Sequence, residues 1–123
     1  MMQHEAIEQQ RLFQWAAFMS GKYKELEYLH HIPNGGSRNK KEAVNLKRQG
    51  VRAGVPDLDL PVARKGYHGL RIEMKYGKNK PTEEQVKWLV FLKAQGYATA
   101  VCYSWQEAAR TICRYLDIDE SGI

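Results

Sequence analysis

Three residues of this chain have the types and the spacing for metal-dependent chemistry. Asp57 follows Pro56 at the start of an apolar stretch, and Glu73 and Lys75 lie further along in the segment GLRIEMK. Side chains two apart on a strand point to the same face, so Glu73 and Lys75 share a face. Asp57 can lie beside them if its strand pairs with theirs. Two adjacent carboxylates repel each other, and a divalent cation relieves that repulsion. The pattern predicts a metal site with an ammonium group beside it, able to stabilise charge on a phosphate.

The elements that must position these residues follow from periodicity and from the punctuating Gly and Pro residues. The order of helices and strands predicts an α/β chain with a mixed sheet covered by helices. The aromatic residues Trp15, Phe18, Trp88 and Phe91 recur at helical spacing, and we expect them in the core. The predicted helices are His4 to Ser20, Lys40 to Gln49, Thr82 to Gln95 and Trp105 to Leu116, and the predicted strands are Tyr28 to Ile32, Asp57 to Leu60, Leu70 to Lys75 and Tyr97 to Tyr103.

Length and composition exclude several classes of protein. The chain has 123 residues, 43% of them hydrophobic, so we expect one domain over residues 1–123 with its own core. No apolar run approaches the roughly 20 residues of a membrane span, and the polar start MMQHEAIEQQ is unlike a signal peptide. Cys102 and Cys113 are too few for a disulfide framework, so we expect two reduced thiols in a cytoplasmic protein. No Walker loop or dinucleotide fingerprint occurs, so no nucleotide cofactor is expected.

The net charge of +5 is unevenly distributed along the chain. The segment from Arg38 to Lys80 holds twelve basic residues against four acidic ones, so it carries +8 and the remainder carries −3. Such a basic segment is typical of a surface that contacts a phosphate backbone, and a solvated, loop-rich surface is the alternative. The candidate DNA contacts, which position the backbone without reading its sequence, are Arg38, Lys40, Lys41, Lys47, Arg48 and Arg52.

Pro56-Asp57 followed by Glu73-Met74-Lys75 is the active-site pattern of the PD-(D/E)xK nucleases. The chain further resembles the virus-type replication-repair nuclease family (VRR-NUC) of that superfamily, and especially its phage-encoded stand-alone members. The resemblance rests on HIPNGG (31–36), GVRAGVPDL (50–58), GLRIEMK (69–75) and TEEQVKWL (82–89), which occur in the order of the family. It implies a restriction-endonuclease-like fold with a central mixed β-sheet flanked by helices.

The resemblance also implies roles for individual residues. Asp57 and Glu73 would be metal ligands together with the backbone carbonyl of Met74, and Lys75 the catalytic lysine. Glu8 matches the acid on the family's first helix that approaches the metal. Glu5 competes with it, and we favour Glu8 for the functional role; either could instead be an acid stabilised by the helix dipole.

Two further positions leave alternatives open. Gln85 matches a glutamine that places substrate or a water, but it also forms a predicted capping box with Thr82, and both roles are possible if the side chain is shared. Asp59 occupies a position that is usually apolar in the family. It is either an accessory ligand or turned to solvent, and we favour the latter.

The histidines suggest a competing kind of site, a histidine-metal nuclease of the HNH type. The spacing of His30, His31, Asn34 and His68 does not give that motif. We therefore expect these histidines to support the fold, and we expect residues 31–36 to form a turn at the edge of the active site or against DNA.

Together these observations predict a Mg²⁺-dependent endonuclease, with Mn²⁺ as a substitute, that hydrolyses DNA phosphodiester bonds. The family resemblance implies 5′-phosphate and 3′-hydroxyl products and branched substrates such as Holliday junctions or flaps, in phage replication, recombination or repair. A phage-encoded enzyme would act in the host cytoplasm, and a homodimer would suit the symmetry of a junction. Two alternatives are a non-cleaving DNA-binding protein and a nuclease subunit that needs a partner.

Overall fold

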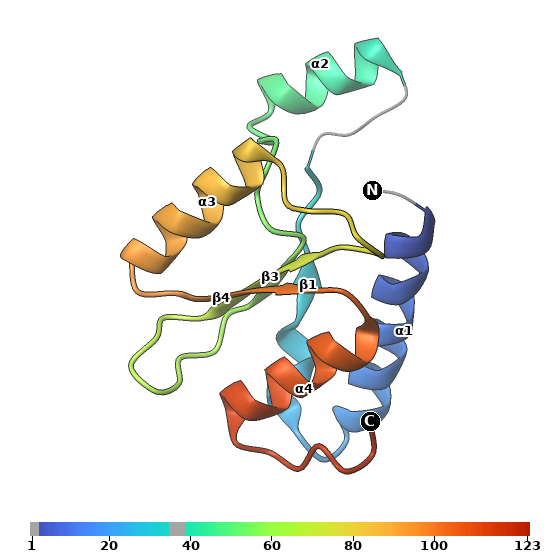
Figure 1. Ribbon diagram of the computed structural model, residues 1–123, viewed down its shortest axis with the longest axis vertical. Helices are drawn as coiled ribbons and strands as arrows, with labels where there is room; N and C mark the ends of the chain where they lie inside the picture. Colours follow the sequence, from blue (N-terminus) through green and yellow to red (C-terminus); the bar gives the residue numbers. More distant parts are fainter. Residues whose placement is uncertain (1–2, 35–38) are drawn as a thin grey trace.

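The computed structural model describes residues 3–34 and 39–123, and it places helices on both sides of a four-stranded sheet (Figure 1). α1 and α4 lie together on one side, and α3 lies on the other. In chain order the elements are α1 (Gln3–Met19), the 3-10 helix η1 (Lys24–Tyr28), β1 (His30–His31), α2 (Lys40–Arg48), β2 (Leu58–Leu60), β3 (Leu70–Met74), α3 (Glu83–Ala94), β4 (Ala98–Cys102) and α4 (Trp105–Leu116).

The sheet is mixed, as predicted. Its order is β1-β2-β3-β4, with β1 and β2 antiparallel, β2 and β3 antiparallel, and β3 and β4 parallel. The parallel pair requires a crossover connection, and α3 provides it. Leu58 pairs with Ile72, and Asp59 pairs with Arg71. The strand carrying the Asp57 motif therefore pairs directly with the strand carrying Glu73.

The core lies between the sheet and the α1–α4 layer. Leu58, Ile72 and Met74 are at most 1% exposed and contribute to one cluster with Leu12 of α1 and Ile112 of α4. Because strand side chains alternate, burying these apolar residues on one face turns Asp59, Arg71 and Glu73 to the other face. Packing on the α1–α4 side thus fixes the polar side of the sheet as the place where chemistry can occur.

The prediction that four aromatic residues lie in the core is only partly right. Trp15 is buried, but Phe18 of α1 is 85% exposed and Phe91 of α3 is 57% exposed. Trp88 is half-buried, and Leu92 is the buried residue of α3. Apolar residues occur on several sides of α3, so helical spacing alone does not determine which side faces the sheet.

Three further features bear on function. Among the described residues, no helix is long and apolar enough to cross a membrane. Cys102 and Cys113 are free and buried, as expected, and burial raises the pKa of each thiol to about 11. α2 has no buried residue and projects beyond the end of the sheet near the N-terminus of α3 (Figure 1).

Candidate active site

Asp57 is fixed by its neighbours on both sides in the sheet. The backbone N–H of Met74 donates to its Oδ2 atom over 2.9 Å. Its carbonyl oxygen accepts from the N–H of Ile32 over 2.7 Å and from Nδ1 of His31 over 2.9 Å. A carbonyl only accepts, so the His31 proton lies on Nδ1. These bonds hold the Asp57 carboxylate against β3, within hydrogen-bonding reach of Glu73.

Glu73 lies in a crowded electrostatic environment. It is 2% exposed, and burial raises its pKa to about 8, with additional contributions from the charge of Asp57 and the hydrogen bond between the two carboxyl groups. Lys75 opposes this shift from a distance of 3.6 Å, measured from Nζ to Oε2, and Glu5 adds to it. The Oε1 atom of Glu73 is buried without a hydrogen-bond partner among the described residues. One carboxyl oxygen therefore remains available for a ligand.

Glu5, and not the preferred Glu8, is the acid that α1 brings to the site. Glu5 is 5% exposed and lines the same cleft as Asp57 and Glu73. Glu8 instead accepts from the N–H of Trp105 over 3.0 Å and pairs with Arg11 over 3.2 Å. The preference for Glu8 is therefore wrong in placement, because Glu8 lies almost one turn further along α1, where its carboxylate meets the start of α4 and not the cleft.

The acids open into a cleft of about 550 Å³. Part of its wall comes from the loop that follows β3, and Asn79 and Lys80 from that loop were not predicted as site residues. Their place in the sequence could have identified them, since a loop that follows the strand of Glu73 and Lys75 directly must start at the same end of the sheet. The described residues lining the cleft are Glu5, Asn34, Asp57, Glu73, Lys75, Asn79, Lys80, Thr82 and Gln85.

Gln85 forms the predicted capping box and also lines the cleft. The backbone N–H of Thr82 donates to Gln85 Oε1 over 2.8 Å, and the backbone N–H of Gln85 donates to Thr82 Oγ1 over 3.2 Å. This is the predicted capping box. Because the cap uses Oε1, the amide nitrogen is the part of the side chain that can serve the cleft, which Gln85 also lines.

Gly54 allows the segment that leads to Asp57 to pass close to α3. Its φ is +88°, and a Cβ atom there would lie 2.8 Å from the backbone carbon of Glu84. Glycine adopts this conformation without strain and leaves the necessary space. Gly54, the second glycine of GVRAGVPDL, thus helps to place Asp57 relative to the N-terminus of α3.

Asp59 is neither an accessory ligand in the cleft nor turned freely to solvent. Its carboxylate is 16% exposed and pairs with Nε of Arg71 over 3.1 Å and with Nε2 of His30 over 3.5 Å. Arg71 also lies over the ring of Tyr97, at 5.3 Å from the centroid. The preference for a solvent-facing Asp59 is therefore wrong, because the register of β2 and β3 places a basic partner opposite it.

The histidines do not gather into a site. His31 supports Asp57 through its carbonyl, and His30 also donates from Nδ1 to the carbonyl of Tyr28 over 2.9 Å. His68 packs edge-on against Tyr97 with 5.9 Å between the ring centroids. These contacts agree with histidines that support the fold. Of the turn 31–36, residues 31–34 are described, and Asn34 lines the cleft.

Among the described residues, none of the predicted DNA contacts lines the cleft. Lys40, Lys41, Lys47 and Arg48 are exposed on α2, and Arg38 lies outside the described residues. Arg52 is exposed beyond α2 and lines a separate pocket of about 460 Å³ against α3. These positions are accessible to a ligand larger than the cleft itself.

The donor set fits a divalent cation that keeps much of its water. Among the described residues, no three or more His, Cys, Asp or Glu side chains are grouped closely enough to enclose an ion. Asp57 and Glu73 form a close pair, however, and Glu73 Oε1 has no partner. Mg²⁺ is commonly held by one or two carboxylates plus waters and substrate phosphates. The open site matches that mode of binding better than an all-protein cage.

The comparisons with known proteins agree with this geometry. The model of the VRR-NUC domain matches residues 2–106. A solved structure described as a VRR_NUC domain protein is 33% identical to this chain, with a TM-score of 0.77 over 93% of this chain and 88% of the other. The comparison with curated proteins gives no match.

The mixed sheet and the Asp57, Glu73 and Lys75 constellation at one end of its two central strands define a restriction-endonuclease-like fold of the PD-(D/E)xK class. Within that class, the chain belongs to the VRR-NUC domain family. Membership implies a nuclease domain with DNA as its substrate.

Proposed function

We propose that this protein is a divalent-metal-dependent endonuclease that hydrolyses phosphodiester bonds in branched DNA. The observation that carries the proposal is the meeting of Asp57, Glu73 and Lys75 in one cleft, at the centre of the basic segment of the chain. A carboxylate pair beside an ammonium is the arrangement needed to hold a cation against a phosphate and to balance the charge that develops on it.

The chain's own residues have separable tasks in this mechanism. Asp57, Glu73 and the Met74 carbonyl would hold the cation, with Glu5 acting at longer range. Mg²⁺, or Mn²⁺ as a substitute, would lower the pKa of bound water and neutralise the scissile phosphate. Lys75 is 7% exposed, and its Nζ is positioned to hold a water or to donate to a phosphate oxygen. Gln85 would orient substrate or water through its amide nitrogen.

Binding of the DNA backbone is assigned to α2 and the segment after it. The exposed Lys40, Lys41, Lys47, Arg48 and Arg52 can contact phosphates on a duplex arm while the cleft holds the scissile bond. Arg38 is a further candidate from the sequence. A homodimer would present two clefts to the related arms of a four-way junction, and light scattering of the purified protein tests that state.

Cleavage of defined DNA substrates tests the proposal. Plasmid, single-stranded, flap and four-way junction DNA are incubated with the protein in Mg²⁺, Mn²⁺ or EDTA. We expect cleavage in either metal, preferentially of the branched substrates, and none in EDTA. Asp57→Asn and Lys75→Met should each lower the rate by at least about a hundredfold, since the first removes a charged ligand of the cation and the second removes the ammonium beside the reacting phosphate.

Glu27→Gln on η1 and Lys93→Met on α3 are matched controls, because both side chains are exposed and neither lines the cleft. Cleavage that persists in EDTA or in the Asp57 and Lys75 variants would refute the mechanism. Tight binding without cleavage would favour a DNA-binding protein, and activity that needs cell extract would favour a subunit of a larger assembly.

A further inference from the structure

A pair of stacked aromatic rings connects α1 to the loop that follows β3. The rings of His4 and Tyr76 lie 4.4 Å apart between centroids, at an interplanar angle of 15°. His4 precedes Glu5, and Tyr76 follows Lys75, and both of those charged residues line the cleft. The two rings therefore stand within one residue of the acid and of the lysine that serve the proposed chemistry.

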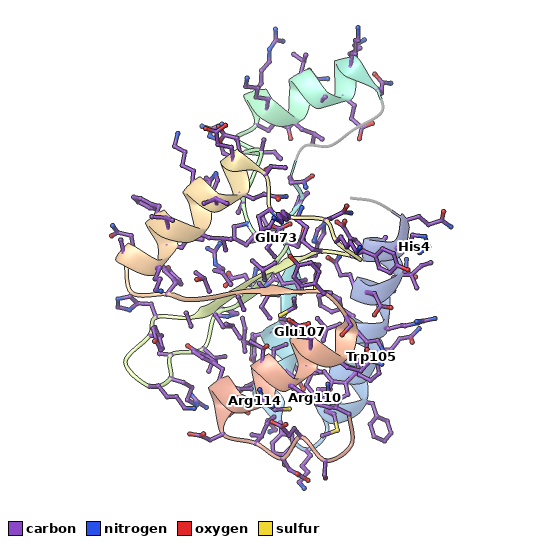
Figure 2. The ribbon with its side chains drawn as sticks, in the orientation of Figure 1. His4, Glu73, Trp105, Glu107, Arg110 and Arg114 are labelled. Atoms are coloured by element: carbon purple, nitrogen blue, oxygen red, sulfur yellow. The ribbon has the colours of Figure 1, made fainter. Side chains whose placement is uncertain are left out.

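The backbone brings the two partners of this pair together from α1 and from the loop after β3. Figure 1 shows the loop between β3 and α3 reaching across to the N-terminal end of α1. Figure 2 shows His4 at that end of α1, on the side that faces the loop. The contact thus connects segments that are far apart in the sequence, and each ring is next in sequence to a residue that lines the cleft.

The stack retains open aromatic surface. Tyr76 is 41% exposed, and His4 is also exposed. In a parallel pair each ring covers one face of the other, so the remaining exposure lies on the outer faces and the edges. A planar ring that arrives from solvent can extend the stack at the offset distances that aromatic groups prefer.

The surroundings of Tyr76 favour a nucleotide as that ring. Tyr76, Lys78 and Lys80 alternate along one exposed loop, and Lys80 also lines the cleft. Aromatic rings interleaved with basic side chains are the usual means of binding single-stranded nucleic acid, with bases stacking on the rings and phosphates contacting the cations. Bases inside a duplex are already stacked on each other, so only an unpaired base can use such a surface.

We infer that the His4–Tyr76 pair is a stacking platform for an unpaired base next to the scissile phosphate. The inference rests on the proposed nuclease function and narrows its substrate to DNA with single-stranded character at the cleavage point. The platform would also favour binding of branched DNA at the cleft, because an unpaired base becomes available where a duplex opens at a fork or junction.

Fluorescence of a base analogue tests the platform without requiring cleavage. Forked DNA carries one 2-aminopurine as the first unpaired nucleotide, and the protein is added in EDTA. We expect quenching by the wild-type protein and by Tyr76→Phe, which keeps the aromatic ring, and little quenching by Tyr76→Ala. Tyr28→Ala is the matched control, because Tyr28 is 61% exposed on η1 and lines a different pocket.

A second measurement separates stacking from a purely structural role of the ring pair. Replacing the unpaired base by an abasic site removes the stacking partner but leaves the phosphates. Tyr76→Ala should weaken binding of the normal fork by roughly 5- to 150-fold, the range for one base–aromatic stack, and should leave binding of the abasic fork unchanged. A variant that merely displaces Glu5 or the loop would lose equal affinity for both DNAs.

Equal losses on both forks, or quenching that survives Tyr76→Ala, would overturn the platform. If the wild-type protein cleaves forks but never quenches the analogue, the platform fails while the nuclease function stands. If it neither binds nor cleaves DNA, both fail. Circular dichroism melting of Tyr76→Ala confirms that the variant is folded at the assay temperature.

Discussion

Glu73→Gln should make the metal-free protein more stable while abolishing cleavage. Burial and the neighbouring Asp57 raise the pKa of Glu73 to about 8, so the folded chain keeps a proton there at neutral pH. Glutamine has the same shape, carries no charge and can donate to Asp57 as the protonated acid does. The substitution therefore preserves the packing of the site and removes the titration.

The size of the effect follows from the difference between the folded and unfolded chains. The ordinary pKa of 4.5 applies when the chain is unfolded, against about 8 when it is folded. Between these values the folded chain binds more protons, so the free energy of unfolding falls as pH rises, by up to about 1.4 kcal/mol per pH unit. Summed from pH 4.5 to pH 7, the free energy of unfolding of the wild type falls by about 3 kcal/mol. Glu73→Gln does not titrate at this position, so it should be more stable than the wild type by that amount at pH 7 and by little near pH 4.5.

Urea denaturation of the metal-free protein between pH 5 and pH 8 measures this directly. The wild-type protein should lose stability relative to Glu73→Gln across that range, and the control Glu27→Gln should follow the wild-type curve. Added Mg²⁺ should stabilise the wild type and not the Gln variant, because an ion that binds only the folded chain shifts unfolding by mass action. Parallel curves for wild type and Glu73→Gln, or a less stable variant at pH 7, would refute the electrostatic account.

Three other predictions concern the surroundings of the site. Replacing Lys40 and Lys41 by alanine should weaken DNA binding and lower the slope of log Kd against log salt by up to about 0.9 per lost phosphate contact. The stabilisation of the protein by Mg²⁺ should not change. An unchanged slope would show that α2 does not contact the DNA. Gly54→Ala should cost about 2 kcal/mol or more by thermal denaturation, since both its φ and the space oppose a Cβ. Cys102 and Cys113 should resist DTNB at pH 8 until the chain unfolds, and rapid labelling of the native protein would contradict their burial.

Much of the sheet and part of the site could be predicted from sequence, because both depend on strand alternation. The apolar positions Leu58, Ile72 and Met74 turn inward together, which leaves Asp57 and Glu73 on the other face. This period of two is local and robust. The burial of β2 follows this alternation, whereas β4 is half-buried along most of its length.

What could not be predicted depends on helix rotation and on contacts between distant segments. Glu5 and Glu8 lie within one turn of α1, and only the packing of that helix on α4 decides which of them faces the cleft. Asp59 has a basic partner only because β2 and β3 pair in a particular register. The His4–Tyr76 contact likewise joins two segments that lie far apart in the sequence and that no local pattern relates.

The charge pattern favours a nuclease over a protein that only binds DNA. A surface that serves merely to bind phosphate gains nothing from burying Asp57 and Glu73 at its centre, since carboxylates repel phosphates and each buried charge costs free energy. That cost is visible in the raised pKa of Glu73 and in its unpartnered oxygen. A cation between the carboxylates and a phosphate converts both repulsions into attractions. The acids therefore make physical sense in this basic segment when metal and phosphate are bound together, which is the condition for hydrolysis.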